Sequence, residues 1–330
     1  MIKYSVLVTG GAGYVGAELI PKLLSSGYRV SVIDLMIYNK DVFKHHEQNE
    51  DLKIFKGDIR DLDLLEHVMK NIDCVIHLAC ISNDPSFELN PNLGKSINLD
   101  CFFPLVKIAK KHGCQRFIYA SSSSVYGIKS ERNVTEDLSL EPLTDYSKYK
   151  AQCEDILLGE MSSKFTTTIL RPSTVCGFSR RQRLDVVVNI LTSHAYHNKK
   201  ITILGGEQLR PNIHIKDMVR VYENIVSSES SKIDGKIYNV GYENYSLNEI
   251  AKIVSEKFDE QISINYKQTN DPRSYHVSSK LIEKELGFKS EFTVQNAVED
   301  LLNSFKNNLI PNAMTDNIYY NVKRMQEIKL

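Results

Sequence analysis

Short apolar runs alternate with amphipathic segments through the first half of the chain. The apolar runs are rich in Val and Ile, and several lack any polar alternation, as is typical of strands buried on both faces of a parallel sheet. The predicted strands span residues 5–9, 29–34, 53–56, 74–78, 116–120 and 167–171. The segments between them predict helices over residues 15–26, 62–70, 93–111 and 146–161. Repeated β-α units of this kind favour an α/β fold with a doubly wound parallel sheet.

Beyond about residue 178 the pattern is less regular. Helices are predicted over residues 184–197, 247–258, 279–286 and 294–306, and short strands over residues 200–204, 236–240 and 263–266. We expect residues 1–178 to form a first domain and residues 179–330 to form a smaller mixed α/β lobe, partly interleaved with it. The polar tail from residue 307 to residue 330 is expected to be a docking arm.

The composition narrows the classes of partner. The chain has 330 residues, of which 42% are hydrophobic and 25% charged, an ordinary balance for a globular protein. The 41 basic side chains equal the 41 acidic ones, so net charge gives no case for nucleic acid or an anionic membrane as partner.

Other global features point to a cytoplasmic protein. The N-terminus shows no basic and apolar leader, and no apolar run reaches the roughly 18 residues that span a bilayer. Six cysteines are scattered without a C-x-x-C pair, which indicates buried, reduced thiols. No His/Cys cluster has the spacing of metal ligands, so we expect no metal site.

A glycine-rich run connects the first predicted strand to the first predicted helix. Gly10, Gly13 and Gly16 permit a tight turn and let the backbone approach a pyrophosphate closely. The N-terminus of the following helix offers N–H groups and a favourable dipole to that anion. Such a run could be only a tight turn, but its place between a strand and a helix is that of a dinucleotide-binding loop.

Asp34 ends the second predicted strand, 18 residues after Gly16. A carboxylate at this position can accept hydrogen bonds from both hydroxyls of an adenosine ribose, and it repels a 2′-phosphate. No arginine follows within residues 35–38 to bind that phosphate. The sequence therefore predicts NAD rather than NADP as cofactor, the alternative being a solvated loop aspartate.

Two ionisable side chains share one face of a predicted helix. Tyr146 and Lys150 stand four residues apart. A phenol has a pKa near ~10, and a neighbouring ammonium group favours the phenolate, which could then take a proton from a substrate hydroxyl. Ser122 follows the fifth predicted strand, and in parallel sheets ligands bind at the carboxyl ends of the strands. A surface Tyr–Lys pair and a polar serine loop are the alternatives when each motif is taken alone.

Taken together, these motifs resemble the extended short-chain dehydrogenase/reductase family, the NAD-dependent epimerase/dehydratase group that includes UDP-galactose 4-epimerase. The resemblance covers about residues 4–305. The glycine run, the S-x-x-V-Y-G of residues 122–127, and Tyr146 with Lys150 all occur in the order of the family. The resemblance implies a Rossmann-type domain that binds NAD, and a homodimer formed through the helices at residues 93–111 and 146–161.

The resemblance also implies roles for individual residues. Ser122, Tyr146 and Lys150 would form the catalytic group, with Tyr146 as the base. The residues expected to bind NAD are Gly10, Gly13, Tyr14, Val15, Gly16, Asp34, Asp58, Ile59, Leu78, Ala79, Cys80, Asn98, Tyr146, Lys150, Pro172 and Val175. The residues expected to bind the substrate are Asn83, Ser123, Thr174, Asn189, Arg210 and Arg273.

Departures from the family pattern bear on the reaction. The 4,6-dehydratase branch carries an acidic pair directly after the catalytic hydroxyl, whereas this chain has Ser123 and Ser124, so elimination of water is disfavoured. The late Arg-x-x-Asp of the family is absent, and Arg273 is the candidate replacement. The cluster at residues 180–183 is also unusual, and both a phosphate contact and a solvated loop are open for it.

The resemblance implies NAD-dependent oxidation of a nucleotide-linked sugar at C4, ending in epimerisation or in net 4-dehydrogenation. Residues 171–177, 180–183 and 319–323 resemble bacterial GDP-heptose 4-dehydrogenases of capsule polysaccharide biosynthesis. The alternatives are a UDP-hexose 4-epimerase and, more remotely, a non-catalytic NAD-binding redox sensor, which would need only the glycine loop.

Overall fold

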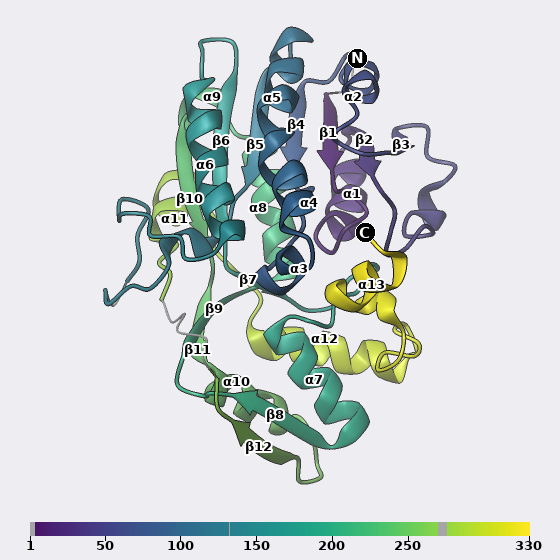
Figure 1. The fold of residues 1–330 in the computed structure, drawn as a ribbon, viewed down its shortest axis with the longest axis vertical. Helices are drawn as coiled ribbons and strands as arrows, with labels where there is room; N and C mark the ends of the chain where they lie inside the picture. The colour runs from purple at the N-terminus through teal and green to yellow at the C-terminus, as the bar shows by residue number, and fades with distance from the viewer. Residues whose placement is uncertain (1–3, 132, 270–275) are drawn as a thin grey trace.

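A seven-stranded parallel sheet forms the centre of the protein. The computed structural model describes residues 4–131, 133–269 and 276–330 (Figure 1). The strand order is β10-β6-β5-β4-β1-β2-β3, and each neighbouring pair is parallel. The strands are β1 (Ser5–Thr9), β2 (Arg29–Asp34), β3 (Leu52–Lys56), β4 (Cys74–His77), β5 (Arg116–Ala120), β6 (Thr166–Pro172) and β10 (Lys236–Val240).

Helices cover both faces of this sheet. The described part of the whole chain, main sheet and smaller lobe together, has the helices α1 (Gly16–Ser25), α2 (Leu62–Val68), α3 (Asp84–Glu88), α4 (Pro91–Lys95), α5 (Phe102–Lys111), α6 (Asp145–Gly159), α7 (Val187–Asn198), α8 (Ile215–Ser227), α9 (Ser230–Ile233), α10 (Leu247–Ser255), α11 (Lys280–Leu286), α12 (Val294–Lys306) and α13 (Asn321–Ile328). Val6 and Val8 of β1 pack in the cluster that contains α1 and α8. Leu7 and Val75 pack in the cluster that contains α2, α5 and α6. Because successive strand residues point to opposite faces, both sets are apolar, and the predicted doubly wound sheet is confirmed.

The six strands predicted for the first half are confirmed, and their ends differ from the prediction by at most one residue. The single helix predicted over residues 93–111 is wrong, because a π-turn at Ser96–Asp100 separates α4 from α5. The Asn98 amide accounts for the break. Its Oδ1 accepts from the Ile81 N–H at 2.8 Å, and its Nδ2 donates to the Ile81 carbonyl at 2.9 Å. Turns of this kind inside helices are frequent at functional sites.

A smaller lobe follows β6. It holds a three-stranded sheet of order β11-β9-β7 and a two-stranded sheet of β12 and β8. These strands are β7 (Thr174–Cys176), β8 (Lys200–Leu204), β9 (Leu209–His214), β11 (Glu243–Ser246) and β12 (Ser263–Lys267). α7, α10 and α12 join them in an apolar cluster that includes Leu191, Ile250 and Val298. β10 and the unpredicted α8 come later in the chain yet belong to the layers of the main sheet. The division of the chain at residue 178 stays a prediction.

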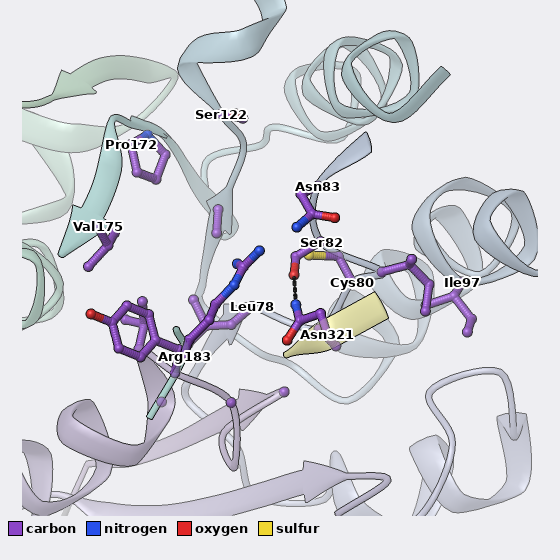
Figure 2. A pocket seen from close by; sticks show the side chains of 18 of the residues that line it. Leu78, Cys80, Ser82, Asn83, Ile97, Ser122, Pro172, Val175, Arg183 and Asn321 are labelled. Carbon is purple, nitrogen blue, oxygen red and sulfur yellow. Dashed lines mark hydrogen bonds between the residues drawn. The ribbon is translucent and has the colours of Figure 1, made fainter. Parts of the chain in front are cut away.

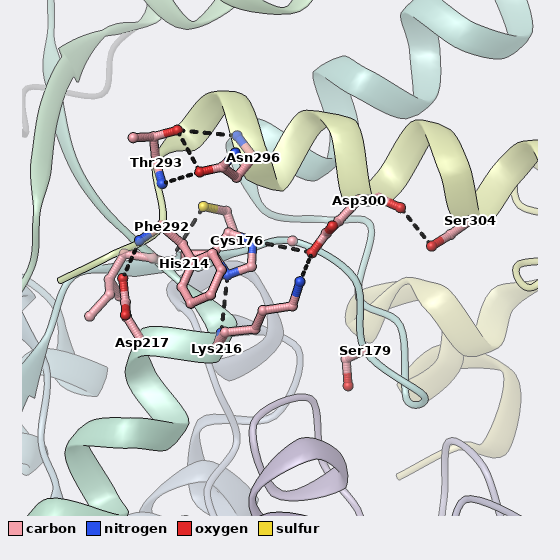
Figure 3. A network of polar contacts seen from close by, with 12 residues as sticks. Cys176, Ser179, His214, Lys216, Asp217, Phe292, Thr293, Asn296, Asp300 and Ser304 are labelled. Carbon is pink, nitrogen blue, oxygen red and sulfur yellow. Dashed lines mark hydrogen bonds and ion pairs between the residues drawn. The ribbon is translucent and has the colours of Figure 1, made fainter.

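A polar network fastens α12 of the lobe to α8 of the main sheet (Figure 3). Asp217, fully buried near the start of α8, accepts the backbone N–H of Phe292 at 2.9 Å. Lys216 Nζ lies 2.7 Å from Asp300 Oδ2 on α12. A buried carboxylate that lost these partners would be costly, so the network holds the lobe in one orientation against the sheet. Residues from both parts can therefore form one site.

The C-terminal tail packs on its own chain. Tyr319 and Tyr320 are each 7% exposed and join an apolar cluster with Leu184 and Phe305. Arg324 Nε donates to the Ile37 carbonyl at 2.6 Å, which attaches α13 to the loop after β2. The tail that was expected to be a docking arm therefore packs against its own chain, because its few aromatic residues bury enough apolar surface to hold it there.

All six cysteines are unpaired; five are buried, as expected, whereas Cys80 is half-buried. In the part of the chain that the structure describes, no helix is long and apolar enough to cross a membrane. The same described residues contain no group of three or more His, Cys, Asp or Glu side chains that could hold a metal ion.

A buried ion pair between β6 and α6 gives a test of the fold. Arg171 Nη2 lies 2.6 Å from Glu154 Oε2, and the two side chains are 3% and 2% exposed. Removing one partner leaves the other charge buried, so Glu154→Leu should lower the free energy of unfolding by about 3–5 kcal/mol. Urea unfolding at neutral pH measures this. The control is the double variant that carries Glu154→Leu and Arg171→Met. Its free energy of unfolding should fall by less than the sum of the decreases in the two single variants. Additive losses would contradict the pairing.

Candidate active site

A cavity of about 400 Å³ opens at the carboxyl ends of the central strands (Figure 2). Its wall is formed by the turns that follow β1, β2, β4, β5 and β6, together with segments of the lobe and of the C-terminal tail. In open α/β sheets, ligands bind outside the carboxyl ends of the strands. The sheet therefore brings together the motifs that the sequence scatters over more than a hundred residues.

The glycine turn forms one side of the cavity. Gly10 has a positive φ of 71°, and a Cβ there would lie 2.6 Å from the Ala79 backbone, so no other residue fits without moving the chain. A Cβ at Gly13 would meet only the Gly10 carbonyl, at 3.1 Å, and both residues line the cavity. Gly16 begins α1, whose N-terminus faces this space. The turn thus leaves room for a phosphate group against the backbone.

Asp34 is held in the wall of the cavity by backbone donors. Its Oδ2 accepts the Ala12 N–H at 3.0 Å, and its Oδ1 accepts the Met36 N–H at 2.7 Å. Burial raises the pKa of Asp34, and these two hydrogen bonds act in the opposite direction. Each carboxylate oxygen keeps a second lone pair, which suits a carboxylate that binds a ribose diol.

Ser122 and Tyr146 lie together in the wall of the cavity. Burial raises the pKa of the Tyr146 phenol, as does the nearby Asp84 carboxylate, whereas Arg183 and a hydrogen bond with Ser122 lower it. The neutral phenol is therefore the resting form in this structure. Arg183 is the leading positive charge among these influences, a role that the sequence suggested for Lys150.

Lys150 lies behind the wall of the cavity. Its Nζ donates to the Ala120 carbonyl at 2.6 Å and stands 5.9 Å from the centre of the Tyr146 ring. The residue is 4% exposed. Lys150 therefore ties α6 to the end of β5 and places Tyr146 beside the serine run.

Most of the residues expected to bind the cofactor line the cavity. Those in its wall are Gly10, Gly13, Tyr14, Val15, Gly16, Asp34, Asp58, Ile59, Leu78, Ala79, Cys80, Tyr146, Pro172 and Val175. Asn98 and Lys150 stand one layer behind, where they brace the loop at Ile81 and the end of β5. The glycine turn, the carboxylate at the end of β2 and this continuous wall fit a dinucleotide such as NAD.

The residues expected to bind the substrate are less well assembled. Asn83, Ser123 and Thr174 line the cavity, whereas Asn189 and Arg210 are not in its wall. Arg273 lies outside the described residues. The expected grip of Asn189 on a diphosphate is replaced by protein contacts, since its Nδ2 donates to Tyr14 Oη at 3.0 Å and its Oδ1 accepts the Gly177 N–H at 3.0 Å. Arg210 lies in β9 of the lobe.

The arginine cluster divides between the surface and the cavity. Arg180 is on the surface, with its Nη1 2.8 Å from Glu18 Oε2. Arg181 and Arg183 line the cavity, and Arg183 Nε donates to Asp185 Oδ1 at 2.6 Å. The solvated-loop alternative is therefore wrong for these two residues. The clustering of arginines directly after the segment at residues 171–177 is the only sequence signal that could have identified them.

The C-terminal tail supplies a further side chain that the sequence did not assign. Asn321 at the start of α13 lines the cavity, and its Nδ2 donates to Ser82 Oγ at 2.9 Å (Figure 2). Its backbone N–H donates to Asp185 Oδ2 at 2.8 Å. The segment at residues 319–323 drew notice in the sequence as a resemblance, but its place in the cavity could not be predicted, because the partners of Asn321 lie far away in the sequence.

Known proteins are similar to this chain over nearly its whole length. The family model described as "NAD dependent epimerase/dehydratase family" matches residues 6–241. A bifunctional UDP-glucose 4-epimerase and UDP-xylose 4-epimerase of Pisum sativum is 25% identical, covering 92% of this chain and 96% of its own. The UDP-glucose 4-epimerase of Lactobacillus helveticus is 26% identical, covering 86% of this chain and 91% of its own.

Solved structures agree with these relatives. The UDP-glucuronic acid 4-epimerase of Bacillus cereus, in complex with UDP-glucuronic acid and NAD, has a TM-score of 0.83 and 25% identity, covering 92% of this chain and 99% of its own. The UDP-N-acetylglucosamine 4-epimerase of Methanobrevibacter ruminantium, in complex with UDP-N-acetylmuramic acid, has a TM-score of 0.82 and 25% identity, covering 92% and 100%.

The position of Asp34 makes the choice of cofactor testable. Asp34→Ala should weaken NAD binding about 10-fold, as expected when a ligand loses a hydrogen bond to a charged group. The ratio of NADP to NAD affinity should rise, because the charge that repels a 2′-phosphate is gone. Titration calorimetry on nucleotide-free protein measures both constants. Asp41→Ala, an exposed change in the loop that follows β2, is the matched control. Equal affinities of the unaltered protein for NAD and NADP would refute this role.

Proposed function

This chain belongs to the NAD dependent epimerase/dehydratase family, and from that premise we propose that it oxidises a nucleotide-linked sugar at C4, with Tyr146 as the base. NAD is the cofactor of the family, and it supplies the hydride acceptor when bound. The observation that carries the proposal is the placement of Tyr146 and Ser122 in one cavity with the glycine turn and Asp34. A protein that only sensed NAD would have no use for this pair, so the sensor alternative has less support.

The chain's own residues would bind, orient and deprotonate the sugar. Ser122 Oγ would hold the C4 hydroxyl, and Tyr146 Oη would accept its proton. Because burial raises the pKa of Tyr146, positive charge is needed to stabilise the phenolate, and Arg183 is placed to provide it. Lys150 would keep the helix and the serine run in register through its bond to Ala120. Asn83 and Thr174 line the remaining wall and would contact the sugar.

Oxidation that stops short of elimination fits this wall best. Ser123 and Ser124 occupy the positions where the dehydratase branch carries its acidic pair, and both line the cavity. A serine hydroxyl is too weak an acid to act as the general acid that expels water from the neighbouring carbon. We therefore favour epimerisation or net dehydrogenation over dehydration.

The leading candidate is 4-epimerisation of a UDP-hexose, the activity that the names of several relatives carry. The second candidate is a GDP-heptose 4-dehydrogenase of capsule polysaccharide biosynthesis. Three residues favour this candidate. The segments in which this chain resembles such enzymes contribute Arg181, Arg183 and Asn321 to the wall of the cavity. An epimerase would interconvert two sugars with no lasting NADH, whereas a dehydrogenase would release a 4-keto sugar and retain NADH. Product analysis with UDP-glucose and with a GDP-heptose separates the two. We also place the reaction in the cytoplasm, where the unpaired cysteines would stay reduced.

The role of Tyr146 is tested by single-turnover reduction of bound NAD, followed at 340 nm with nucleotide sugar in excess. Tyr146→Phe removes only the ionisable oxygen, so the fold and the bound NAD should be kept while the rate falls at least ~10²-fold. Ser122→Ala should lower the rate less, because Ser122 orients the hydroxyl and does not carry the proton. Tyr149→Phe on the same helix is the matched control and should react at the unaltered rate. A Tyr146→Phe protein as fast as this control would exclude Tyr146 as base.

We further propose a homodimer formed through α5 and α6, which lie side by side over one face of the sheet (Figure 1). Phe103 on α5 is 46% exposed, and Met161 just beyond α6 is 39% exposed. A contact of two helices per subunit would be self-complementary about a twofold axis. Sedimentation at micromolar concentration should show a dimer, and Phe103→Glu should shift it toward monomer. The control is Leu309→Glu, at a position 57% exposed elsewhere on the molecule. A monomer for the unaltered protein would refute the proposal.

A further inference from the structure

Arg181 is a buried cation with incomplete partners. The residue is 3% exposed, and its Cζ stands 3.7 Å from the centre of the Tyr38 ring. Its Nη2 donates to Asn321 Oδ1 at 2.6 Å. Its Nε has no hydrogen-bond partner among the residues that the structure describes. An arginine carries five N–H donors, and leaving buried donors unpaired is unfavourable.

The neighbouring carboxylates do not pair with this guanidinium. Asp185 binds Arg183 and the backbone of Asn321, and Asp34 accepts two backbone N–H groups. Burial lowers the pKa of Arg181 to about 10, so it stays positively charged at neutral pH in a place that disfavours the charge. A ligand that brought acceptors or negative charge to Arg181 would satisfy it.

The surroundings of Arg181 indicate which ligand this is. Arg181, Tyr38 and Asp34 all line the cavity. Arg181 lies against Tyr38, a residue of the loop that follows Asp34, and Asp34 accepts the N–H of Ala12 in the glycine turn. This part of the wall fits the adenosine diphosphate half of NAD, with Asp34 toward the ribose. That half of the cofactor carries ribose hydroxyls and phosphate oxygens, which are the acceptors a guanidinium prefers.

We propose that Arg181 is a cofactor-binding residue that donates to the adenosine diphosphate half of NAD, and that Asn321 holds it in place. The binding surface for NAD then includes the 180–185 loop and the C-terminal tail as well as the strand ends. The proposal depends on NAD binding and not on which sugar is oxidised.

The contacts of the tail extend beyond Arg181. Asn321 bridges Arg181, Asp185 and Ser82, three residues from two separate loops of the cavity wall. Arg324 attaches the same helix to the Ile37 carbonyl in a third loop. The tail therefore connects three loops of the cavity wall, and loss of the Asn321 contacts should loosen the wall around Arg181.

The test compares Arg181→Gln with Arg180→Gln, the adjacent arginine on the surface of the same loop. The readouts are the NAD content of the purified protein and the rate at which bound NAD is lost on dilution into NAD-free buffer. We expect Arg181→Gln to lose NAD at least ~10-fold faster than the Arg180→Gln control, the factor that corresponds to one charge-assisted hydrogen bond. Asn321→Ala should change the rate in the same direction. A loss rate equal to that of the control would overturn the proposal.

Two further measurements keep the result interpretable. The melting temperature of the nucleotide-free Arg181→Gln protein should equal or exceed that of the control, since a buried cation is removed, and this separates lost binding from lost folding. Thermal shifts with adenosine and with ADP then identify the acceptor. If ADP stabilises Arg181→Gln less than it stabilises the control while adenosine stabilises both equally, Arg181 contacts a phosphate. If both ligands stabilise Arg181→Gln less, Arg181 contacts the adenosine. Unchanged shifts with both, together with weaker binding of nucleotide sugar, would assign Arg181 to the sugar substrate and overturn the proposal, while leaving the proposed function standing.

Discussion

The cavity depends on the close approach of two backbone segments, the turn at Gly10 and the loop at Ala79. A Cβ at Gly10 would lie 2.6 Å from the Ala79 backbone, so only glycine lets the turn after β1 pass beside the loop after β4. That loop continues to Ile81, whose N–H and carbonyl are both held by Asn98. It then reaches Ser82, which meets the C-terminal tail. The absence of a side chain at Gly10 therefore sets the course of a loop that also contacts Asn98 and the C-terminal tail.

The parts of the fold that follow from local pattern could be predicted from the sequence. Strands buried on both faces need uninterrupted apolar runs, and all six predicted for the first half are present. The break at Ser96–Asp100 could not be predicted, because its cause is a long-range pair of hydrogen bonds to Ile81. Helix α8 was not predicted, for a related reason. Its hydrophobic residues complete a face of the main sheet from a position far along the chain, after the pattern of alternating strands and helices has ended.

The candidate site divides in the same way. Its proposed cofactor half consists of short motifs at strand ends, and nearly all of the residues that the motifs and the resemblance assign to it line the cavity. Its substrate half is assembled from distant segments. Asn189 and Arg210, which the resemblance assigns to the substrate, are not in the wall, whereas Arg183, which was given no definite role, lines it. The positive charge that acts on the Tyr146 phenol also differs from the one expected from the sequence. Local spacing pointed to Lys150 as the charge that acts on the Tyr146 phenol, but the folded chain brings Arg183 from the lobe as the stronger influence.

The π-turn at Ser96–Asp100 also limits how this protein can change over evolutionary time. A π-turn holds one more residue than the α-helical turn it replaces, so deleting a single residue there would restore a regular helix. Each residue of an α-helix turns the chain by roughly 100°. The deletion would therefore swing Asn98 away from Ile81 and release the loop that forms the floor of the cavity. Substitutions at neighbouring positions can be absorbed one side chain at a time, but a change of length in this segment cannot. Proteins that evolve from this chain should therefore differ in residue identity in this segment but keep its length unchanged.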